Sequence, residues 1–278
     1  MRCLAAQGVD VENIVLLTDF GLADPYVGQL KGRLADLCPK CRILDLSHGV
    51  EPFAVAQAAF FLRCSWSHFP AQSIFICVVD PGVGGKRDIV LLTSGERHFL
   101  APDNGLLSLV MSSQPDATAR LVDGAHLIPS PSTTFHGRDI FAPLAAKLAN
   151  GTPASDLGRE VPAKNLVQPR WSAPIYDHGD LTCNVLHVDR FGNCILNLET
   201  ATWLPVLANW PGVFLHAHRV VEITLAHTYV ELAARDCGLI SGGQGFLELA
   251  RNMYSATDFL GLDLGDEVHL SPGRGTHP

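Results

Sequence analysis

Short apolar runs alternate with stretches of helical periodicity along the first part of the chain. The runs occupy residues 14–17, 43–46, 73–79 and 89–92. The first ends at Thr18-Asp19-Phe20-Gly21 and is followed by apolar residues at helical spacing from Tyr26 to Cys38, and the second is followed by the apolar stretch Val55–Phe61. Strands that alternate with helices predict an α/β domain in which a mostly parallel sheet lies between helices.

The pattern changes after the stretch between Gly151 and Gly179, where four prolines interrupt any regular element. Beyond it the apolar segments are short, alternating and β-branched, which predicts a second domain of mainly antiparallel β structure. The exception is Phe246–Tyr254, which we interpret as a helix. We therefore expect an α/β domain over residues 12–165, a linker over 166–178 and a β-rich domain over 179–278.

Acidic residues outnumber basic ones, 28 to 20, which gives a formal net charge of −8. Such a chain carries no basic surface suited to phosphate backbones or anionic lipids, so nucleic-acid binding is not expected. Its apolar runs fall far short of the roughly 20 residues that a membrane span requires, and Met1–Asn13 lacks the continuous apolar stretch of a signal peptide. Cys38-Pro39-Lys40-Cys41 has CxxC spacing, but no second CxxC follows to complete a metal site. We expect a soluble, cytoplasmic protein with reduced thiols.

Three carboxylates follow expected strands, namely Asp19, Asp80 and Asp103. In open α/β sheets, ligands bind outside the carboxyl ends of the strands, so these three side chains could share one pocket. The alternative is that each Asp caps the helix or turn that follows it, as Asp commonly does.

The loop Val79-Asp80-Pro81-Gly82-Val83-Gly84-Gly85-Lys86-Arg87 is rich in glycine and contains a Gly-Lys pair, as a phosphate-binding P-loop does. The match fails, because a P-loop requires Gly five positions before its Gly-Lys pair and Ser or Thr after it, and this chain has Asp80 and Arg87 there. Asp80 and Arg87 could face each other across the turn. Such a pair could orient a small polar species in a site, or it could be a structural salt bridge that closes the turn.

His136 lies between an aromatic residue and a glycine, just before an expected helix that starts near Asp139. Histidine is the side chain most easily poised for proton transfer near neutral pH, although a lone His is more often structural. No HExxH motif occurs, and we expect no bound metal.

Six segments taken together resemble, in order, the signature blocks of the S-adenosyl-L-methionine (SAM) hydroxide adenosyltransferase family, which is related to the SAM-dependent fluorinases and chlorinases. The segments are Thr18-Asp19-Phe20-Gly21 with Asp24-Pro25-Tyr26-Val27-Gly28, Val79-Asp80-Pro81-Gly82-Val83-Gly84, Ala101-Pro102-Asp103-Asn104-Gly105-Leu106-Leu107, Phe135-His136-Gly137-Arg138-Asp139, Val188-Asp189-Arg190-Phe191-Gly192-Asn193 and Phe246-Leu247-Glu248-Leu249-Ala250-Arg251-Asn252. Any one block is a weak signal, whereas six in the same order are a strong one.

The resemblance implies an enzyme that splits SAM with water or hydroxide into adenosine and L-methionine, by attack on the ribose C5′. SAM is the substrate in this reaction, and neither a cofactor nor a metal is implied. The resemblance further implies an N-terminal α/β domain, a C-terminal β-barrel-like domain, and a homotrimer. In that trimer the substrate lies between the N-terminal domain of one subunit and the C-terminal domain of its neighbour.

The resemblance also implies roles for individual residues. Asp80, Arg87 and His136 match the polar triad that holds and activates the attacking water, and Asp19 matches the acid that grips the ribose hydroxyls. Asp189 and Asn193 match contacts to the methionine amine and the adenine. The same blocks supply five more expected substrate-binding residues, which are Asp24, Asp103, Asn104, Phe191 and Arg251.

Three alternatives stay open. A SAM-dependent halogenase would need a pocket for a halide, but such relatives carry Tyr at the positions of Asp80 and His136, and a carboxylate would repel a halide. A SAM or adenosine sensor would keep the pocket and lose the chemistry, yet all three residues of the triad are present. A metal-dependent phosphohydrolase would depend on added divalent ions.

Overall fold

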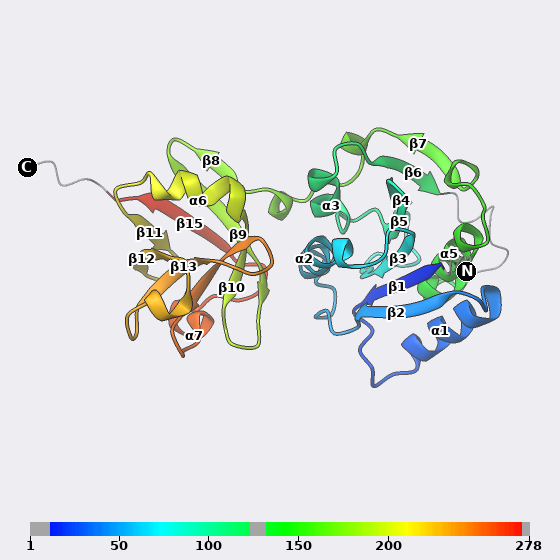
Figure 1. Cartoon of the computed structure of the whole chain (residues 1–278), viewed down its shortest axis with the longest axis horizontal. Coiled ribbons are helices and arrows are strands. Elements are labelled where there is room, and N and C mark those ends of the chain that lie inside the picture. Colours follow the sequence, from blue (N-terminus) through cyan, green and yellow to red (C-terminus); the bar gives the residue numbers. More distant parts are fainter. Residues whose placement is uncertain (1–11, 123–131, 274–278) are drawn as a thin grey trace, which may run out of the picture. The chain divides into compact units, whose positions relative to one another are not determined.

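The computed structural model describes residues 12–122 and 132–273 and divides into two compact units, one ending at Val167 and one beginning at Gln168. Figure 1 shows that the first unit combines a sheet with helices and that the second is built mostly of strands. Within the described ranges, every helix is too short or too polar to cross a membrane.

The first unit is built on a seven-stranded sheet with the order β2-β1-β3-β5-β4-β6-β7. Its strands are β1 (Asn13–Thr18), β2 (Arg42–Ser47), β3 (Ser73–Val78), β4 (Ile89–Ser94), β5 (Arg97–Pro102), β6 (Thr118–Val122) and β7 (Gly158–Val161). β1 pairs in parallel with β2 and β3, and β3 pairs in parallel with β5, whereas β4, β6 and β7 join through antiparallel pairs. Five of the seven described strands therefore run in the same direction, and the predicted α/β fold with a mostly parallel sheet is confirmed.

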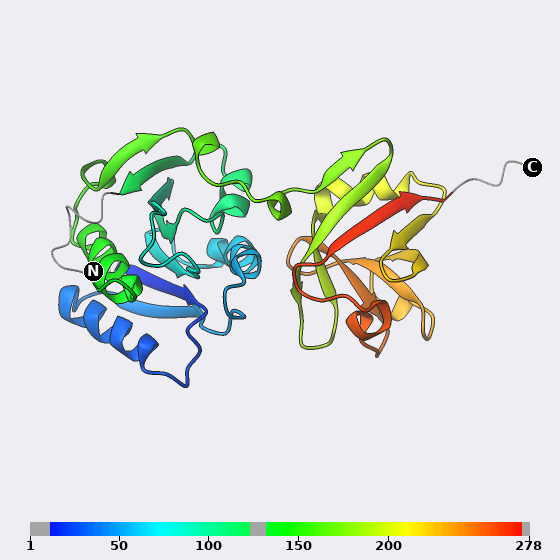
Figure 2. The ribbon, with the colours of Figure 1, turned by 180° about the vertical axis from the view of Figure 1, so that it is seen from behind.

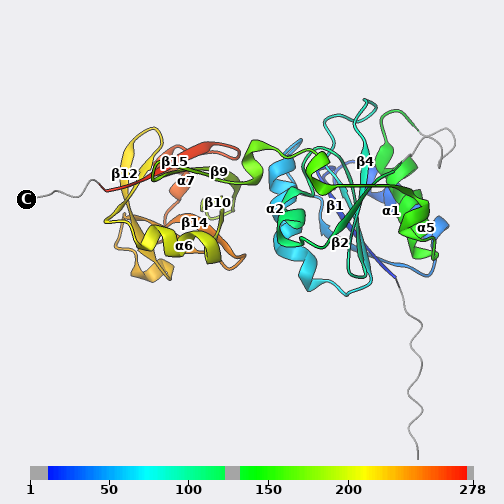
Figure 3. The ribbon, with the colours of Figure 1, turned by 90° about the horizontal axis from the view of Figure 1, so that it is seen from above.

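Helices cover both faces of this sheet (Figure 3). They are α1 (Tyr26–Leu37), α2 (Val55–Ser65), α3 (Ser108–Ser113) and α5 (Ala142–Ala149), and a π-helical turn, Gly137–Phe141, leads into α5. Alternate residues of β1 point to opposite faces, so Ile14 and Leu16 pack with residues of α1 and α5, while Val15 and Leu17 pack with residues of α2 and α3. All of β1 is buried, as expected for a strand inside a sheet covered on both faces.

The second unit is a β-barrel (Figure 2). Its strands are β8 (Ile175–Asp177), β9 (Asp180–Val188), β10 (Cys194–Glu199), β11 (Val213–His216), β12 (Val220–Ala226), β13 (Cys237–Ser241), β14 (Phe246–Arg251) and β15 (Glu267–Pro272), and its helices are α6 (Thr200–Ala208) and α7 (Ala256–Leu260). They follow the order β10-β14-β13-β12-β11-β15-β9-β8, and the pairing of β10 with β9 closes seven of them into a barrel. Among the described strand pairs of this second unit, only β12–β13 is parallel. The expected mainly antiparallel, barrel-like domain is therefore confirmed.

The prediction of a helix at Phe246–Tyr254 is wrong, because Phe246–Arg251 forms strand β14. This strand lies between β10 and β13, and its first five residues are all buried. Its apolar residues at positions 246, 247, 249 and 250 flank the buried Glu248 and match helical spacing over so short a run, so the pattern does not distinguish a strand from a helix. Helix α6, which contains Pro205, was not indicated by the pattern.

Phe75 and Phe99 stack in the core of the first unit, with ring centroids 4.8 Å apart, on the paired strands β3 and β5. Both side chains are fully buried. We expect Phe99→Ala to lower the free energy of unfolding by about 3–5 kcal/mol, because it removes apolar contacts and leaves a cavity. Urea unfolding followed by circular dichroism measures this, with Phe53→Ala as the control, since the Phe53 ring is 70% exposed. A loss below about 1 kcal/mol for Phe99→Ala would contradict this packing.

Candidate active site

A cavity of about 500 Å³ opens at the end of the sheet where β1 and β3 terminate. Its volume lies in the range of small-molecule sites. Four segments of the first unit line it, namely the residues between β1 and α1, the residues before α2, the start of the loop after β3, and the residues that lead into the π-helical turn. The cavity therefore lies where open α/β sheets bind their ligands.

Asp80, Arg87 and His136 meet at this cavity, and Asp80 and His136 line it. Nε of Arg87 lies 3.1 Å and 2.9 Å from the two carboxylate oxygens of Asp80, and the NH2 group of the same guanidinium also binds Asp80. This NH2 group lies 2.7 Å from Nδ1 of His136. The side chains of Asp80 and Arg87 are only 4% and 12% exposed. The structure thus brings together, as one hydrogen-bonded cluster, the three residues that the sequence singles out.

The chemistry of arginine determines which nitrogen of His136 carries the proton. A guanidinium only donates hydrogen bonds, so Nδ1 of His136 accepts from Arg87, and the proton of the neutral imidazole lies on Nε2. Burial and the positive charge of Arg87 lower the pKa of His136 below its ordinary value of 6.5, although Asp80 and Asp139 oppose this effect. At pH 7, His136 is therefore neutral and offers Nε2–H as a donor.

Glycine allows the loop after β3 to approach the segment that precedes His136. A Cβ atom on Gly84 would lie 2.5 Å from the carbonyl oxygen of Thr133, and φ of Gly84 is +77°. A Cβ atom on Gly137 would lie 3.3 Å from the ring of Phe20. These glycines therefore permit close packing of backbone and rings around the cluster.

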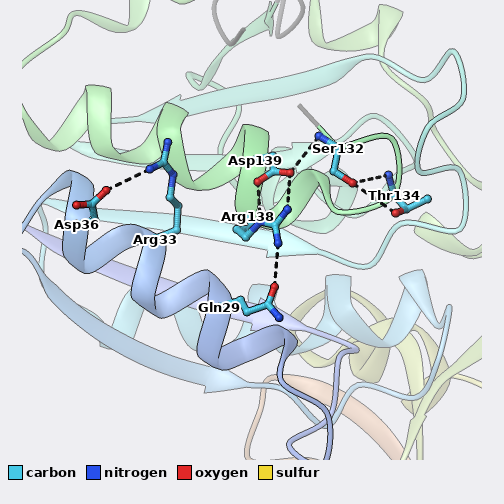
Figure 4. A network of polar contacts seen from close by, with 7 residues as sticks. All are labelled: Gln29, Arg33, Asp36, Ser132, Thr134, Arg138 and Asp139. Carbon is cyan, nitrogen blue, oxygen red and sulfur yellow. Dashed lines mark hydrogen bonds and ion pairs between the residues drawn. The ribbon is translucent and has the colours of Figure 1, made fainter. Parts of the chain in front are cut away.

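A polar network holds the segment around His136 (Figure 4). Arg138 donates hydrogen bonds of 2.6 Å and 2.8 Å to Asp139 and one of 2.9 Å to Gln29 of α1. Asp139 also accepts a hydrogen bond from the backbone N–H of Ser132. Because the network connects α1 to residues on both sides of His136, it restricts the backbone segment that carries His136.

Asp19 and Asp24 line the same cavity. Oδ2 of Asp19 accepts a 2.9 Å hydrogen bond from the backbone N–H of Phe53. Helix α1, which follows Asp19, has no side-chain cap at its N-terminus, so Asp19 does not have the capping role that was its alternative interpretation.

Asp103 and Asn104 make hydrogen bonds to the backbone instead. Asp103 accepts a 3.0 Å bond from the N–H of Val167, and it is absent from the residues that line the cavity. Burial raises the pKa of Asp103. Asn104 donates to the carbonyl oxygen of Val79 at 2.8 Å. These contacts favour a bracing role, in which Asn104 supports the end of β3 beside Asp80.

Aromatic side chains form a wall of the cavity that sequence reasoning missed. Phe20, Tyr26 and Phe135 contact one another edge to face, with ring centroids 5.5–6.0 Å apart, and Phe53 adds an exposed ring. Phe20, Tyr26 and Phe135 do lie within the family blocks quoted above. Phe53 lies outside every block, and nothing in its local sequence distinguishes it from a core phenylalanine.

The remaining expected substrate-binding residues lie in the second unit. Asp189 accepts hydrogen bonds from the backbone N–H groups of Phe191 and Asn193 and from the side-chain amide of Asn193, each of 2.9 Å. It thereby closes the turn from which the exposed Phe191 ring projects. Arg251, at the end of β14, donates to the carbonyl oxygen of Arg235 at 2.8 Å.

Among the described residues, no group of three or more His, Cys, Asp and Glu side chains is placed to hold a metal ion. Cys38 and Cys41 of the CxxC sequence lie in a turn closed by a 3.0 Å hydrogen bond from the N–H of Cys41 to the carbonyl oxygen of Cys38. Burial raises the pKa of the Cys38 thiol to about 12, so this thiol stays protonated at pH 7.

Comparison with known proteins covers both units. The family model of the SAM hydroxide adenosyltransferase N-terminal domain matches residues 14–158, and the model of the C-terminal domain matches residues 183–269. The chain belongs to the SAM hydroxide adenosyltransferase family.

Relatives of this hydroxide adenosyltransferase chain match over nearly its full length. One from Salinispora arenicola, named (R)-S-adenosyl-L-methionine hydrolase, is 35% identical over 264 residues, which are 94% of this chain and 98% of that protein. A fluorinase from Nocardia brasiliensis is more distant at 28% identity, with 94% of this chain and 97% of that protein covered. The crystal structure of an uncharacterized conserved protein from Thermotoga maritima matches with a TM-score of 0.80 and 31% identity, over 93% of this chain and 99% of that chain. The family resemblance of the sequence blocks is thus confirmed.

His136 makes the stability of this hydroxide adenosyltransferase chain depend on pH. Because its pKa is lower in the folded than in the unfolded protein, the folded protein binds fewer protons below about pH 6.5, and stability decreases as the pH falls through that window. We expect His136→Gln to weaken this dependence between about pH 5 and pH 7. Urea unfolding at several pH values measures it, with His68→Gln, at an exposed position, as the control. The same pH dependence in His136→Gln and wild type would contradict the charge state assigned to His136.

Proposed function

We propose that this chain hydrolyses SAM to adenosine and L-methionine and that Asp80, Arg87 and His136 hold and activate the attacking water. The observation that carries the proposal is the hydrogen-bonded cluster of these three residues at a cavity of about 500 Å³. Membership of the hydroxide adenosyltransferase family and the name of the Salinispora relative support the same reaction.

The proposed reaction is a displacement at the ribose C5′. The oxygen of water or hydroxide forms a bond to C5′ while the bond between C5′ and sulfur breaks. Both electrons of the broken bond go to the sulfonium sulfur, which becomes the neutral thioether of methionine, and the water loses one proton. A sulfonium is already a good leaving group, so the difficulty lies in activating and placing the nucleophile.

Three groups act on the attacking oxygen in this proposal. Arg87 is positively charged and favours the hydroxide form of a bound water, while Nε2–H of His136 donates a second hydrogen bond to the same oxygen. The lone pair on Nδ1 of His136 is occupied by Arg87, whereas Oδ1 of Asp80 accepts only one bond from Arg87 and keeps a second lone pair, so we assign the proton to Asp80. Holding the oxygen in line with the bond that breaks lowers the barrier by proximity and orientation.

Acidic residues suit a substrate that carries a sulfonium and an ammonium. We propose that Asp19 binds the ribose hydroxyls and that Asp24, which lines the same cavity, also contacts the substrate. In the second unit, Asp189 would bind the ammonium through a charge-assisted contact. Asn193 would contact the adenine, as the family resemblance implies, and Phe191 and Arg251 would make further contacts to the substrate.

Water is favoured over halide as the nucleophile, although one relative is a fluorinase. Asp80 is almost completely buried, so its negative charge is poorly screened by solvent. A halide at the position of the water would be repelled by this carboxylate, whereas water can donate a proton to it.

We further propose that the enzyme is a homotrimer in which the first unit of one subunit and the second unit of a neighbour enclose the substrate. Large apolar side chains are exposed on both units, including Leu22 and Phe53 on the first and Phe191 and Met253 on the second. Exposed apolar groups of this size are typical of surfaces that contact another protein or a ligand.

Light scattering coupled to gel filtration measures the oligomeric state. We expect a mass of about 90 kDa, three times the 30.0 kDa of one chain. Met253→Glu places a charge among the exposed apolar side chains and is expected to lower the measured mass toward that of one chain, because a buried unpaired charge is unfavourable. A wild-type mass near that of one chain would contradict the trimer.

Incubation of the purified protein with SAM, followed by chromatography of the products, tests the proposed reaction. We expect adenosine and methionine in equal amounts, whether or not fluoride, chloride or EDTA is present. Asp80→Ala is expected to lower the rate by at least about 100-fold, because it removes the proton acceptor and leaves Arg87 without its partner. Asp88→Ala is the matched control, since Asp88 is an exposed acid in the same loop and is expected to retain activity.

The other outcomes of this assay each support a different protein. A 5′-halo-adenosine product would identify a halogenase, and tight binding of SAM without turnover would identify a sensor. Turnover that EDTA abolishes would indicate a metal-dependent enzyme. Each of these results would overturn the proposed function.

A further inference from the structure

Three hydrogen bonds join residues 18–21, at the end of β1 and the start of the following loop, to the segment that follows β2. The Thr18 hydroxyl lies 2.7 Å from Nδ1 of His48, and the backbone N–H of Gly21 donates to the carbonyl oxygen of His48 at 2.9 Å. The N–H of Phe53 donates to Asp19 itself at 2.9 Å. His48 is therefore attached to the chain on both sides of Asp19.

A chain of donors and acceptors gives His48 one orientation. Lys31 donates to Oδ2 of Asp45 at 2.6 Å, and Nε2 of His48 lies 3.0 Å from Oδ1 of Asp45. Burial raises the pKa of Asp45, but the hydrogen bonds from Lys31 and His48 outweigh this and hold the pKa below its ordinary value of 3.8. The ionised carboxylate only accepts, so Nε2 of His48 donates to it, and in the neutral imidazole Nδ1 then accepts from the Thr18 hydroxyl. The Thr18 oxygen in turn accepts from the N–H of Phe20 at 3.3 Å.

The inner part of this chain is buried and the outer part is not. Thr18 is completely buried and the His48 side chain is 3% exposed, whereas Asp45 at the outer end is 40% exposed. A buried donor or acceptor is costly to leave unpaired, so the geometry between Thr18 and His48 is strongly specified. The register of β1 with β2 also shifts just before His48, and such a bulge changes the direction of the residues that follow.

Phe53 adds strain at the other contact with Asp19. Its φ is +67°, in the left-handed region that residues with side chains seldom adopt. This conformation accompanies the hydrogen bond from its N–H to the Asp19 carboxylate. The segment from His48 to Phe53 therefore contacts both the carboxylate of Asp19 and the backbone beside it.

We propose that His48 is a positioning residue for substrate binding, which acts through the Thr18 hydroxyl to hold Asp19 in the orientation that binds the ribose hydroxyls. This inference rests on the proposed function, since that function assigns the ribose to Asp19. His48 itself does not contact the substrate in this arrangement. Its contribution is to restrict the orientation of the Asp19 carboxylate, which lies on a loop.

Two substitutions at Thr18 separate the hydroxyl from the packing. Thr18→Val removes the hydroxyl and keeps the shape of the side chain, whereas Thr18→Ser keeps the hydroxyl. We expect Thr18→Val to raise the KM for SAM and the Kd for adenosine about tenfold, as the loss of one buried hydrogen bond would. We expect kcat to change less than about threefold, because the reacting atoms are untouched. Thr18→Ser should restore binding.

The chain provides a matched control. Thr93 makes a 3.0 Å hydrogen bond with Nδ1 of His98 across the pair β4–β5 of the same sheet. Thr93→Val therefore removes the same type of hydrogen bond without touching the Asp19 loop. We expect thermal unfolding to report a comparable loss of stability in Thr18→Val and Thr93→Val, and only the former to change KM.

Adenosine and 2′,3′-dideoxyadenosine, compared by calorimetry, distinguish an effect on the ribose from a general loss of structure. Thr18→Val should weaken binding of adenosine and leave binding of the dideoxy compound unchanged, because only adenosine has the hydroxyls that Asp19 binds. Equal losses for both nucleosides, an unchanged KM in Thr18→Val, or a raised KM in Thr93→Val would each overturn the role of His48.

Two further results remain decisive. If Thr18→Val does not fold, Asp45→Ala replaces it, because Asp45 lies at the exposed end of the chain of hydrogen bonds and its loss should change nucleoside binding in the same direction. If the wild-type protein does not turn over SAM, the proposed reaction fails, and the nucleoside comparison still tests whether His48 positions Asp19.

Discussion

Parallel pairing of β1 with β3 is the constraint on which the candidate active site depends. The last residues of the two strands, Thr18 and Val78, pair with each other, so the chain emerges from neighbouring positions at one edge of the sheet. Asp19 follows Thr18 directly, and Asp80 follows Val78 after one more residue, Val79. Both strands are buried along their whole length, so a change of register would carry polar residues that flank the apolar runs into the core. The spacing between the two acids is therefore set by the hydrophobic core rather than by the loops that carry them.

The buried ion pair links folding to chemistry. A carboxylate as buried as Asp80 is unfavourable unless a cation and further hydrogen bonds accompany it, and Arg87 provides both. The same guanidinium occupies one nitrogen of His136 and disfavours a second positive charge there. One arginine thus stabilises the loop, adds to the effect of burial that keeps the imidazole neutral, and supplies positive potential to the cavity, so its structural and chemical roles cannot be separated.

The sequence predicted the sheet correctly and singled out the three residues of the cluster at the cavity, where the residue types are unusual for their position in the chain. Continuous apolar runs such as β3 belong to a covered sheet, and an acid, a base and a histidine beside glycines are poor choices for a core. The strand Phe246–Arg251 was misassigned because a polar residue, Glu248, is buried in it and leaves its apolar residues at helical spacing. His48 was not recognised because its partners, Thr18 and Asp45, are brought to it by strand register and a bulge, which no local spacing reveals. The exposed ring of Phe53 was missed for a similar reason, since exposure is a tertiary property.

The close contact at Gly84 has a consequence for engineering this scaffold toward other nucleophiles. Since any side chain at Gly84 would collide with the backbone at Thr133, that position tolerates no diversity as long as the two segments stay together. The side chains of Asp80 and His136, by contrast, line the cavity beside this fixed backbone contact. A combinatorial library that randomises His136 and keeps both Gly84 and the buried Asp80–Arg87 pair fixed would vary the nucleophile pocket, and few of its members would fail to close the loop.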